Sequence, residues 1–151
     1  GNGKDNAHRQ SGLQNNKAEM GNIMDFEVYG VALDPQLSNL HVLTAGVGFA
    51  PMEKSTLDLV FHHYRQDKLA ALENERTNLR PRADQQNERA LGNGIDLIWG
   101  WRPNKQWRVE VAAGVFLPSG RFRQSDKADA DKARNVYAGN VEIKYYPNWT
   151  F

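Results

Sequence analysis

An alternation of apolar and polar residues near the end of the chain constrains the fold more than any other feature. From Val136 to Phe151, every second residue is apolar, aromatic or small, beginning at Tyr137, and the residues between them are mostly polar. A period of two predicts a β-strand with one apolar and one polar face. The apolar set includes Trp149 and ends on Phe151, and aromatic residues at the end of a strand are typical of the girdle of a transmembrane barrel.

Four further stretches show the same alternation and are predicted to be strands. The predicted strands are 37–50, 56–65, 92–101, 107–117 and 136–151, and the predicted short turns are 51–55 and 102–106. Centring the first turn on its middle residue places Phe49 opposite Leu57. The same rule places Trp101 opposite Trp107. In both hairpins the apolar faces then coincide, as a two-faced sheet requires.

The other connections are long and polar, and lie at 1–36, 66–91 and 118–135. We expect loops there, with a short helix or an extended piece near 25–34 and one or two helical turns in 66–91. Short turns that alternate with long loops are typical of outer-membrane barrels, in which the short turns face the periplasm. This pattern predicts a periplasmic C-terminus and long loops outside the cell.

Aromatic side chains gather at the strand ends that would face the periplasm, where a membrane-interface belt belongs. They are Phe49, Trp101, Trp107, Trp149 and Phe151. Five strands do not close a membrane barrel, for which about eight is the minimum. We therefore expect this chain to be the C-terminal part of a longer protein. Its fold class is predicted to be all-β, as the last strands of an antiparallel, up-and-down transmembrane β-barrel that forms one domain.

Composition excludes several classes of protein. Hydrophobic residues make up 40% of the chain and the mean hydropathy is −0.70. No apolar run reaches the roughly 18 residues that a transmembrane helix needs. The net charge of +1 provides no electrostatic argument for nucleic-acid binding. The absence of cysteine excludes disulfides and thiolate metal sites. No Gly-x-Ser-x-Gly motif or other catalytic constellation is present, so we expect neither an enzyme nor a cofactor.

Polar side chains on the other face of the predicted strands are candidates for lining a pore. They are Asp58, His62, Tyr64, Asp96, Arg108, Glu110, Glu142 and Lys144. Basic residues in or beside the long loops are candidate contacts for a solute. They are Arg65, Arg80, Arg82, Arg121 and Arg123. No metal site is predicted, because His62 and His63 are adjacent on a strand and therefore point to opposite faces.

Several stretches resemble the C-terminal part of the alginate-export family of bacterial outer-membrane porins. They are Arg9–Lys17, Leu33–Leu40 (LDPQLSNL), Leu57–Gln66 (LDLVFHHYRQ) and Leu91–Leu97 (LGNGIDL). The likeness covers most of residues 9–151. It implies a single-chain barrel of about eighteen strands in the outer membrane of a Gram-negative bacterium. It also implies passive transport of a polyanionic or sugar-like solute. Family members that carry alginate line the pore with arginines, whereas the predicted inner face here holds four carboxylates beside one arginine and one lysine.

These observations together predict an outer-membrane channel for a hydrophilic, anionic polysaccharide or sugar acid. The expected partners are outer-membrane lipid and lipopolysaccharide, the sugar polymer or a small solute, and the barrel-assembly machinery, which would meet the C-terminal strand. Two alternatives stay open. The barrel could be an anchor whose long loops bind a ligand or a surface, as in an adhesin or receptor. The chain could also form a soluble β-barrel with a ligand cavity.

Overall fold

The structure is a computed structural model. It describes residues 17–20, 24–27, 29–35, 39–69, 79–81, 88–124 and 133–147, and the surroundings of side chains in 29–35, 39–69, 88–122 and 133–147. Two of the predicted aromatic residues, Trp149 and Phe151, and the predicted loop contact Arg82 lie outside these ranges. Within them, no helix is long and apolar enough to cross a membrane.

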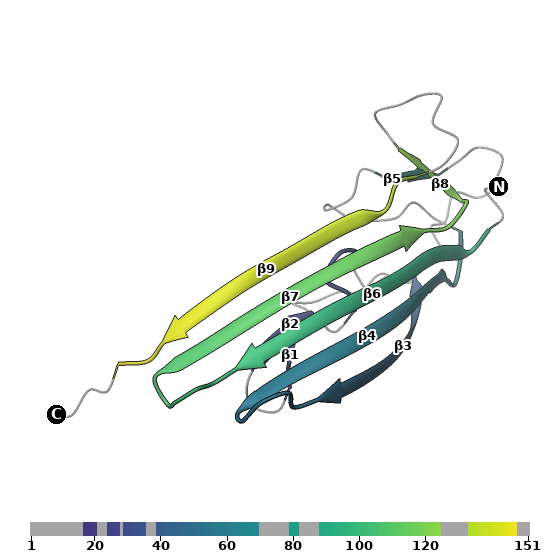
Figure 1. Cartoon of the computed structure of the whole chain (residues 1–151). Helices are drawn as coiled ribbons and strands as arrows, with labels where there is room; N and C mark the ends of the chain where they lie inside the picture. The colour runs from purple at the N-terminus through teal and green to yellow at the C-terminus, as the bar shows by residue number, and fades with distance from the viewer. Residues whose placement is uncertain are drawn as a thin grey trace.

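Five long strands form one antiparallel sheet in the order β3-β4-β6-β7-β9 (Figure 1). Their bounds are Leu40–Phe49 for β3, Ser55–Gln66 for β4, Ala90–Trp101 for β6, Trp107–Pro118 for β7 and Val136–Tyr145 for β9. Long strands that follow one another along the chain are neighbours in the sheet, which is the up-and-down arrangement. The predicted all-β, antiparallel fold class is therefore confirmed. Strands of 10 to 12 residues have the length that a tilted strand needs to cross a bilayer.

The register of the first hairpin agrees with the prediction, since Phe49 pairs with Leu57. The predicted register of the second hairpin is wrong by two residues, because Trp101 pairs with Val109 rather than with Trp107. A shift of two preserves the faces, so the apolar sides still coincide. The physical reason lies in the turn, where Trp107 N donates to Asn104 Oδ1 at 3.1 Å, so that the ladder to β6 begins at Val109. On the other side of β7, Trp107 pairs with Tyr145 of β9.

Backbone hydrogen bonds also join the second turn to the elements beside it. Arg102 N donates to Lys54 O of the first turn at 2.8 Å, and Tyr146 N donates to Gln106 O at 2.8 Å. Each end of the second turn is therefore bonded to the element beside it. Within the turn, the side chain of Asn104 accepts hydrogen bonds from the next residues along the chain, as in an Asx-turn.

The long connections contain short strands that the sequence did not predict. β1 (Lys17–Met20) pairs with β2 (Met24–Glu27), and β5 (Leu79–Pro81) pairs with β8 (Phe122–Gln124). The ambiguous stretch near 25–34 is therefore extended in β2, and a turn follows in which Asp34 N donates to Gly30 O at 3.0 Å. β5 and β8 join two different long connections at the end of the sheet opposite the short turns (Figure 1).

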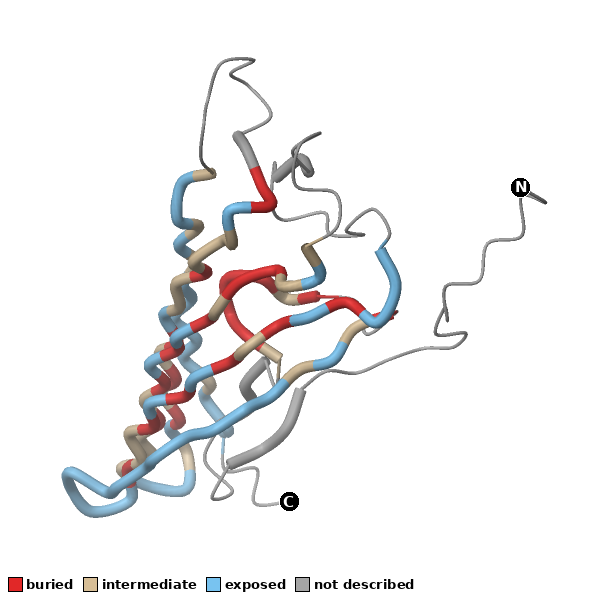
Figure 2. The backbone as a smooth tube through the Cα atoms, turned by 90° about the vertical axis from the view of Figure 1, so that its right-hand side faces the viewer, coloured by how far each residue is buried: buried red, intermediate tan, exposed pale blue. Residues whose placement is uncertain are grey.

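The two faces of the sheet differ sharply in chemistry. The open face carries large apolar side chains that are substantially exposed. They are Leu43, Val47, Phe49, Leu59, Phe61, Ile95, Leu97, Trp107, Tyr137, Val141, Ile143 and Tyr145. On the covered face, side chains of the middle strands are buried beneath the segment Tyr29–Pro35. In Figure 2 the buried positions alternate along the strands and continue in a loop against the sheet. The period of two seen in the sequence thus separates two faces, as predicted.

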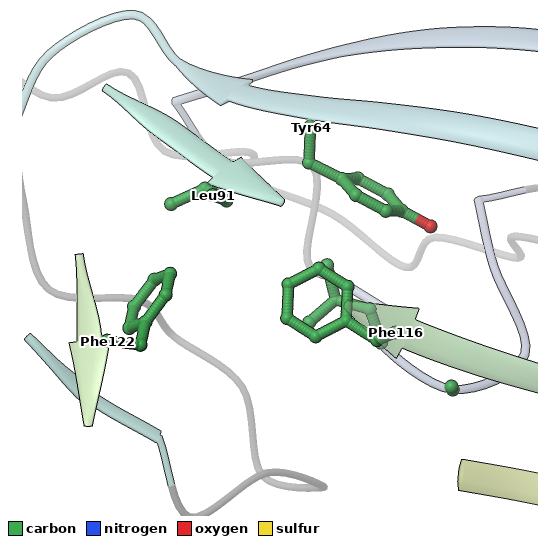
Figure 3. Packing of buried hydrophobic residues seen from close by; sticks show 6 residues of the cluster. Tyr64, Leu91, Phe116 and Phe122 are labelled. Atoms are coloured by element: carbon green, nitrogen blue, oxygen red, sulfur yellow. The ribbon is translucent and has the colours of Figure 1, made fainter. Parts of the chain in front are cut away.

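A small apolar core lies on the covered face, near the end with the long connections. Tyr64, Leu91, Phe116 and Phe122 point toward one another there (Figure 3), and Ala32 and Leu33 complete the cluster. Leu91 reaches this core because the pairing of β4 with β6 shifts at this point, as in a β-bulge. The adjacent Gly92 has φ +142°, a conformation that glycine adopts without strain.

Candidate functional site on the covered face

Six of the eight predicted pore-facing residues are buried on the covered face of the sheet. These six are Asp58, His62, Tyr64, Asp96, Arg108 and Glu110. The other two, Glu142 and Lys144 of β9, pair with Glu110 and Arg108 and therefore lie on the same face. The structure thus brings all eight onto one wall, most of them in two groups. Whether that wall lines a pore stays a prediction.

The first group is centred on Asp96 in the middle of the sheet. The Asp96 carboxylate accepts a hydrogen bond from Val31 N at 3.0 Å, and its Oδ2 lies 3.2 Å from His62 Nε2. That distance is within ion-pair range, but the ring nitrogen is not aligned as a hydrogen-bond partner. On its other side, His62 Nδ1 lies 2.9 Å from Thr44 Oγ1. A polar chain therefore crosses β3, β4 and β6 and ends on the segment Tyr29–Pro35.

The second group is a ladder of four charges on β7 and β9, near the short turns. The register places Arg108 opposite Lys144 and Glu110 opposite Glu142, so like charges face each other across the strands. Opposite charges meet along and diagonally between the strands. Arg108 pairs with Glu110, and Lys144 Nζ lies 3.7 Å from Glu110 Oε2 and 3.0 Å from Glu142 Oε2. The ladder contains two cations and two carboxylates, so its charges balance.

Asp58 stands apart from both groups. It is buried on β4, and its Oδ2 makes no hydrogen bond to any residue that the structure describes. Its side chain lies over Gly48, where a Cβ would collide with it. Asp58 and Asp96 are therefore two buried carboxylates on the same wall, of which only Asp96 contacts the covering segment. This difference makes them a matched pair for experiments.

The predicted basic loop residues occupy different positions. Arg65 is exposed at the end of β4, while Arg121 is buried after β7. Arg121 Nη1 donates to Gln66 Oε1 at 2.6 Å and to Glu88 O at 3.1 Å, which joins two of the long connections. Burial lowers the pKa of the Arg121 guanidinium, and Glu88 acts in the opposite direction. Arg80 and Arg123 pair in the β5–β8 sheet.

Aromatic residues gather at the short-turn end of the open face. Phe49 and Trp107 are exposed there, and Trp101 stacks on Trp99 with ring centroids 6.2 Å apart. The ring of Trp107 packs against that of Tyr145, and their centroids lie 4.8 Å apart. Trp99 and Tyr145 were not among the predicted interface aromatics. The signal was available, since both belong to the apolar set of their strands.

The segment Tyr29–Pro35 is the main feature of this face that the sequence did not predict. It carries one carboxylate, that of Asp34, and the described residues contain no cluster of three or more His, Asp or Glu side chains that could hold an ion. The charges of the ladder on β7 and β9 have opposite charges beside them, and Asp96 lies beside His62.

The apolar open face, its aromatic end and the polar covered face define this sheet as wall of an outer-membrane-type β-barrel. The chain belongs to the alginate export family, whose model matches residues 2–136. No curated protein matches the chain in sequence. The suspected family is thus confirmed, and with it the broad function of transport across the outer membrane.

Proposed function

We propose that this chain forms part of the wall of an outer-membrane channel through which a hydrophilic, anionic sugar polymer passes passively. The observation that carries the proposal is the separation of the two faces. Large apolar side chains cover the open face, where lipid can solvate them, while charged and polar groups occupy the covered face. The polar covered face suits a water-filled interior, and the apolar open face suits the lipid of a membrane.

The charges of the covered face support transport rather than tight binding. Conduction requires interactions that let a solute in but do not retain it. Each charge of the ladder has an opposite charge within 4 Å, and Asp96 accepts a backbone hydrogen bond. A polyanion would therefore meet a charge-balanced ladder, beside which Asp58 and Asp96 add two further carboxylates to the wall. In this proposal, arginines in or beside the long connections, such as Arg65 at the end of β4, provide the attraction at the mouth.

The proposal includes an orientation. The short turns and the end of β9 face the periplasm, and the connections that contain β5 and β8 face the outside. Lipid acyl chains contact the open face, lipopolysaccharide surrounds the outer end, and the assembly machinery engages the C-terminal strand. The pore-lining roles of Asp58, His62, Asp96, Glu110 and the other residues of the covered face belong to the same proposal.

Planar-bilayer recording of the full-length protein tests this function. We expect an ohmic conductance that a polyuronate reduces in a concentration-dependent manner, because the polymer occupies the pore. A neutral polysaccharide of matched length is the control for simple viscosity and crowding. A protein that inserts but carries no current, or a current that polyuronate and the neutral polymer affect equally, would contradict the proposal.

A further inference from the structure

The segment Tyr29–Pro35 crosses the covered face and is held there by specific contacts. Val31 N donates to Asp96 Oδ2 at 3.0 Å, and the Tyr64 hydroxyl donates to Tyr29 O at 2.7 Å. These bonds join the segment to β6, the middle strand of the sheet, and to β4 beside it. A buried backbone amide needs a partner, and the Asp96 carboxylate supplies one where no strand could.

The wall is shaped to receive this segment. A Cβ built on Gly114 of β7 would lie 2.9 Å from Val31 Cβ and 3.2 Å from Ala32 N, closer than side chains pack. A Cβ on Gly94 of β6 would collide with the Tyr64 ring in the same way. Glycine at these positions therefore leaves the space that the segment and the tyrosine beneath it occupy. The middle residues of the segment are buried as deeply as a protein core.

The turn that forms the segment is itself compact. Asp34 N donates to Gly30 O, which closes the turn, and Gly30 has φ +110°, a conformation that favours glycine. Leu33 packs in the same apolar cluster as Tyr64 and Phe116. The segment is thus bonded at two backbone groups and packed at its side chains. It is seated on the wall as a fixed part of it.

We propose that Tyr29–Pro35 is a fixed constriction inside the channel, and that Asp96 and Tyr64 are the positioning residues that hold it against the wall. The inference rests on the proposed channel function. It assigns Asp96 a task different from that of a solute-binding charge, because its carboxylate is engaged by Val31 N and lies beside His62. The segment, by occupying part of the cross-section, sets the largest solute that can pass.

The test compares Asp96→Ala with Asp58→Ala in the full-length protein. Each variant removes one buried carboxylate from the same face, but only Asp96 bonds the segment. Single-channel conductance and exclusion of neutral polyethylene glycols of increasing size are measured for both. We expect Asp96→Ala to raise the conductance and to admit larger polymers. Asp58→Ala should change charge selectivity and keep the wild-type exclusion size.

A disulfide between the segment and β7 tests whether the position of the segment, and not the charge of Asp96, sets the exclusion size. The chain contains no cysteine, so Val31→Cys with Gly114→Cys introduces one pair. Disulfide Cβ atoms lie about 3.8 Å apart, so the pair at 2.9 Å needs an outward shift of about 1 Å. In the Asp96→Ala background, oxidation should return the exclusion size to that of the wild type, and reduction should release it. Tyr64→Phe, which keeps the ring and loses its hydroxyl, should shift the exclusion size in the same direction by a smaller amount.

The outcomes are distinguishable. A wild-type protein that carries no current contradicts the channel function itself. A conducting wild type with equal exclusion sizes for Asp96→Ala and Asp58→Ala contradicts only the constriction. Failure of oxidation to reverse the effect of Asp96→Ala, with the disulfide formed, likewise contradicts it, because the segment would then be back in place without consequence. Unheated gel electrophoresis, on which folded barrels migrate differently from unfolded chains, checks that each variant is folded.

Discussion

Neighbouring residues on the middle strand of the sheet show how different its two faces are. Asp96 is 1% exposed, whereas Leu97, the next residue, is 49% exposed. In a water-soluble protein the apolar residue belongs inside and a buried carboxylate needs compensation. Here the carboxylate is buried and the leucine is exposed, and the exposed apolar side chains of the open face come from all five long strands. The comparison teaches that the open face is matched to lipid and the covered face to a polar interior.

The largest expected effect comes from the apolar core of the covered face. Phe116 is fully buried, and its ring meets that of Tyr64 edge-on at 5.7 Å. Phe116→Ala should lower the free energy of unfolding by about 3–5 kcal/mol, because a large cavity forms. The control is Val115→Ala on the adjacent open-face residue, which should have a smaller effect. Urea titration of the protein in lipid vesicles measures both, and equal losses would show that the two positions share one environment.

A pair of arginine substitutions in β9 tests the comparison most directly. Val141 on the open face is 68% exposed, and Asn140 beside it is also exposed but lies on the opposite face. In a bilayer, Val141→Arg should destabilise the protein by about 2–4 kcal/mol, since a charge near the midplane is poorly solvated. Asn140→Arg should have almost no effect. In water both positions would tolerate arginine, so similar small effects would indicate a soluble protein.

The smallest expected effect concerns the aromatic end of the open face. Trp107 and Tyr145 face each other across β7 and β9 with ring centroids 4.8 Å apart. A double-mutant cycle with Trp107→Leu and Tyr145→Leu should give a coupling free energy of about 0.5–1.5 kcal/mol. Val109 and Ile143, paired in the next row of the same face, provide the control cycle. A coupling no larger than that of the control would remove any special role for the aromatic pair.

The part of this fold that could be predicted follows from local rules. Alternation requires only the strand's own period, so the faces of all five long strands were accessible from the sequence. The register of the first hairpin was also accessible, because the turn that ends near Lys54 is symmetric about its centre. The register of the second hairpin was not accessible by the same rule, because its turn is not centred on Asn104. The Asn104 side chain accepts hydrogen bonds from Gln106 N and Trp107 N, and the ladder to β6 begins only at Val109.

The candidate site was predictable residue by residue but not as an assembly. The polar residues of the covered face could be identified in the sequence, because alternate residues of a strand point to the same face. The segment Tyr29–Pro35 could not be placed, because its anchor is a bond between a backbone amide and Asp96, and neither partner has a distinctive pattern. One signal was present. Gly94 and Gly114 alternate with charged or apolar residues on the face that the segment covers, and such gaps indicate that something approaches the sheet closely.

The backbone bonds at the short turns have a mechanical consequence. Lys54 O and Gln106 O join each turn to the element beside it, so that the end of the sheet is linked both covalently and by hydrogen bonds. A force that pulls neighbouring strands apart is therefore resisted at this end by backbone bonds and does not depend on side chains. At the opposite end backbone bonds also join adjacent strands, since Gln66 N donates to Arg89 O and Ser119 N donates to Leu91 O. Connections of different length can therefore be fitted beyond that end while the strands stay in register.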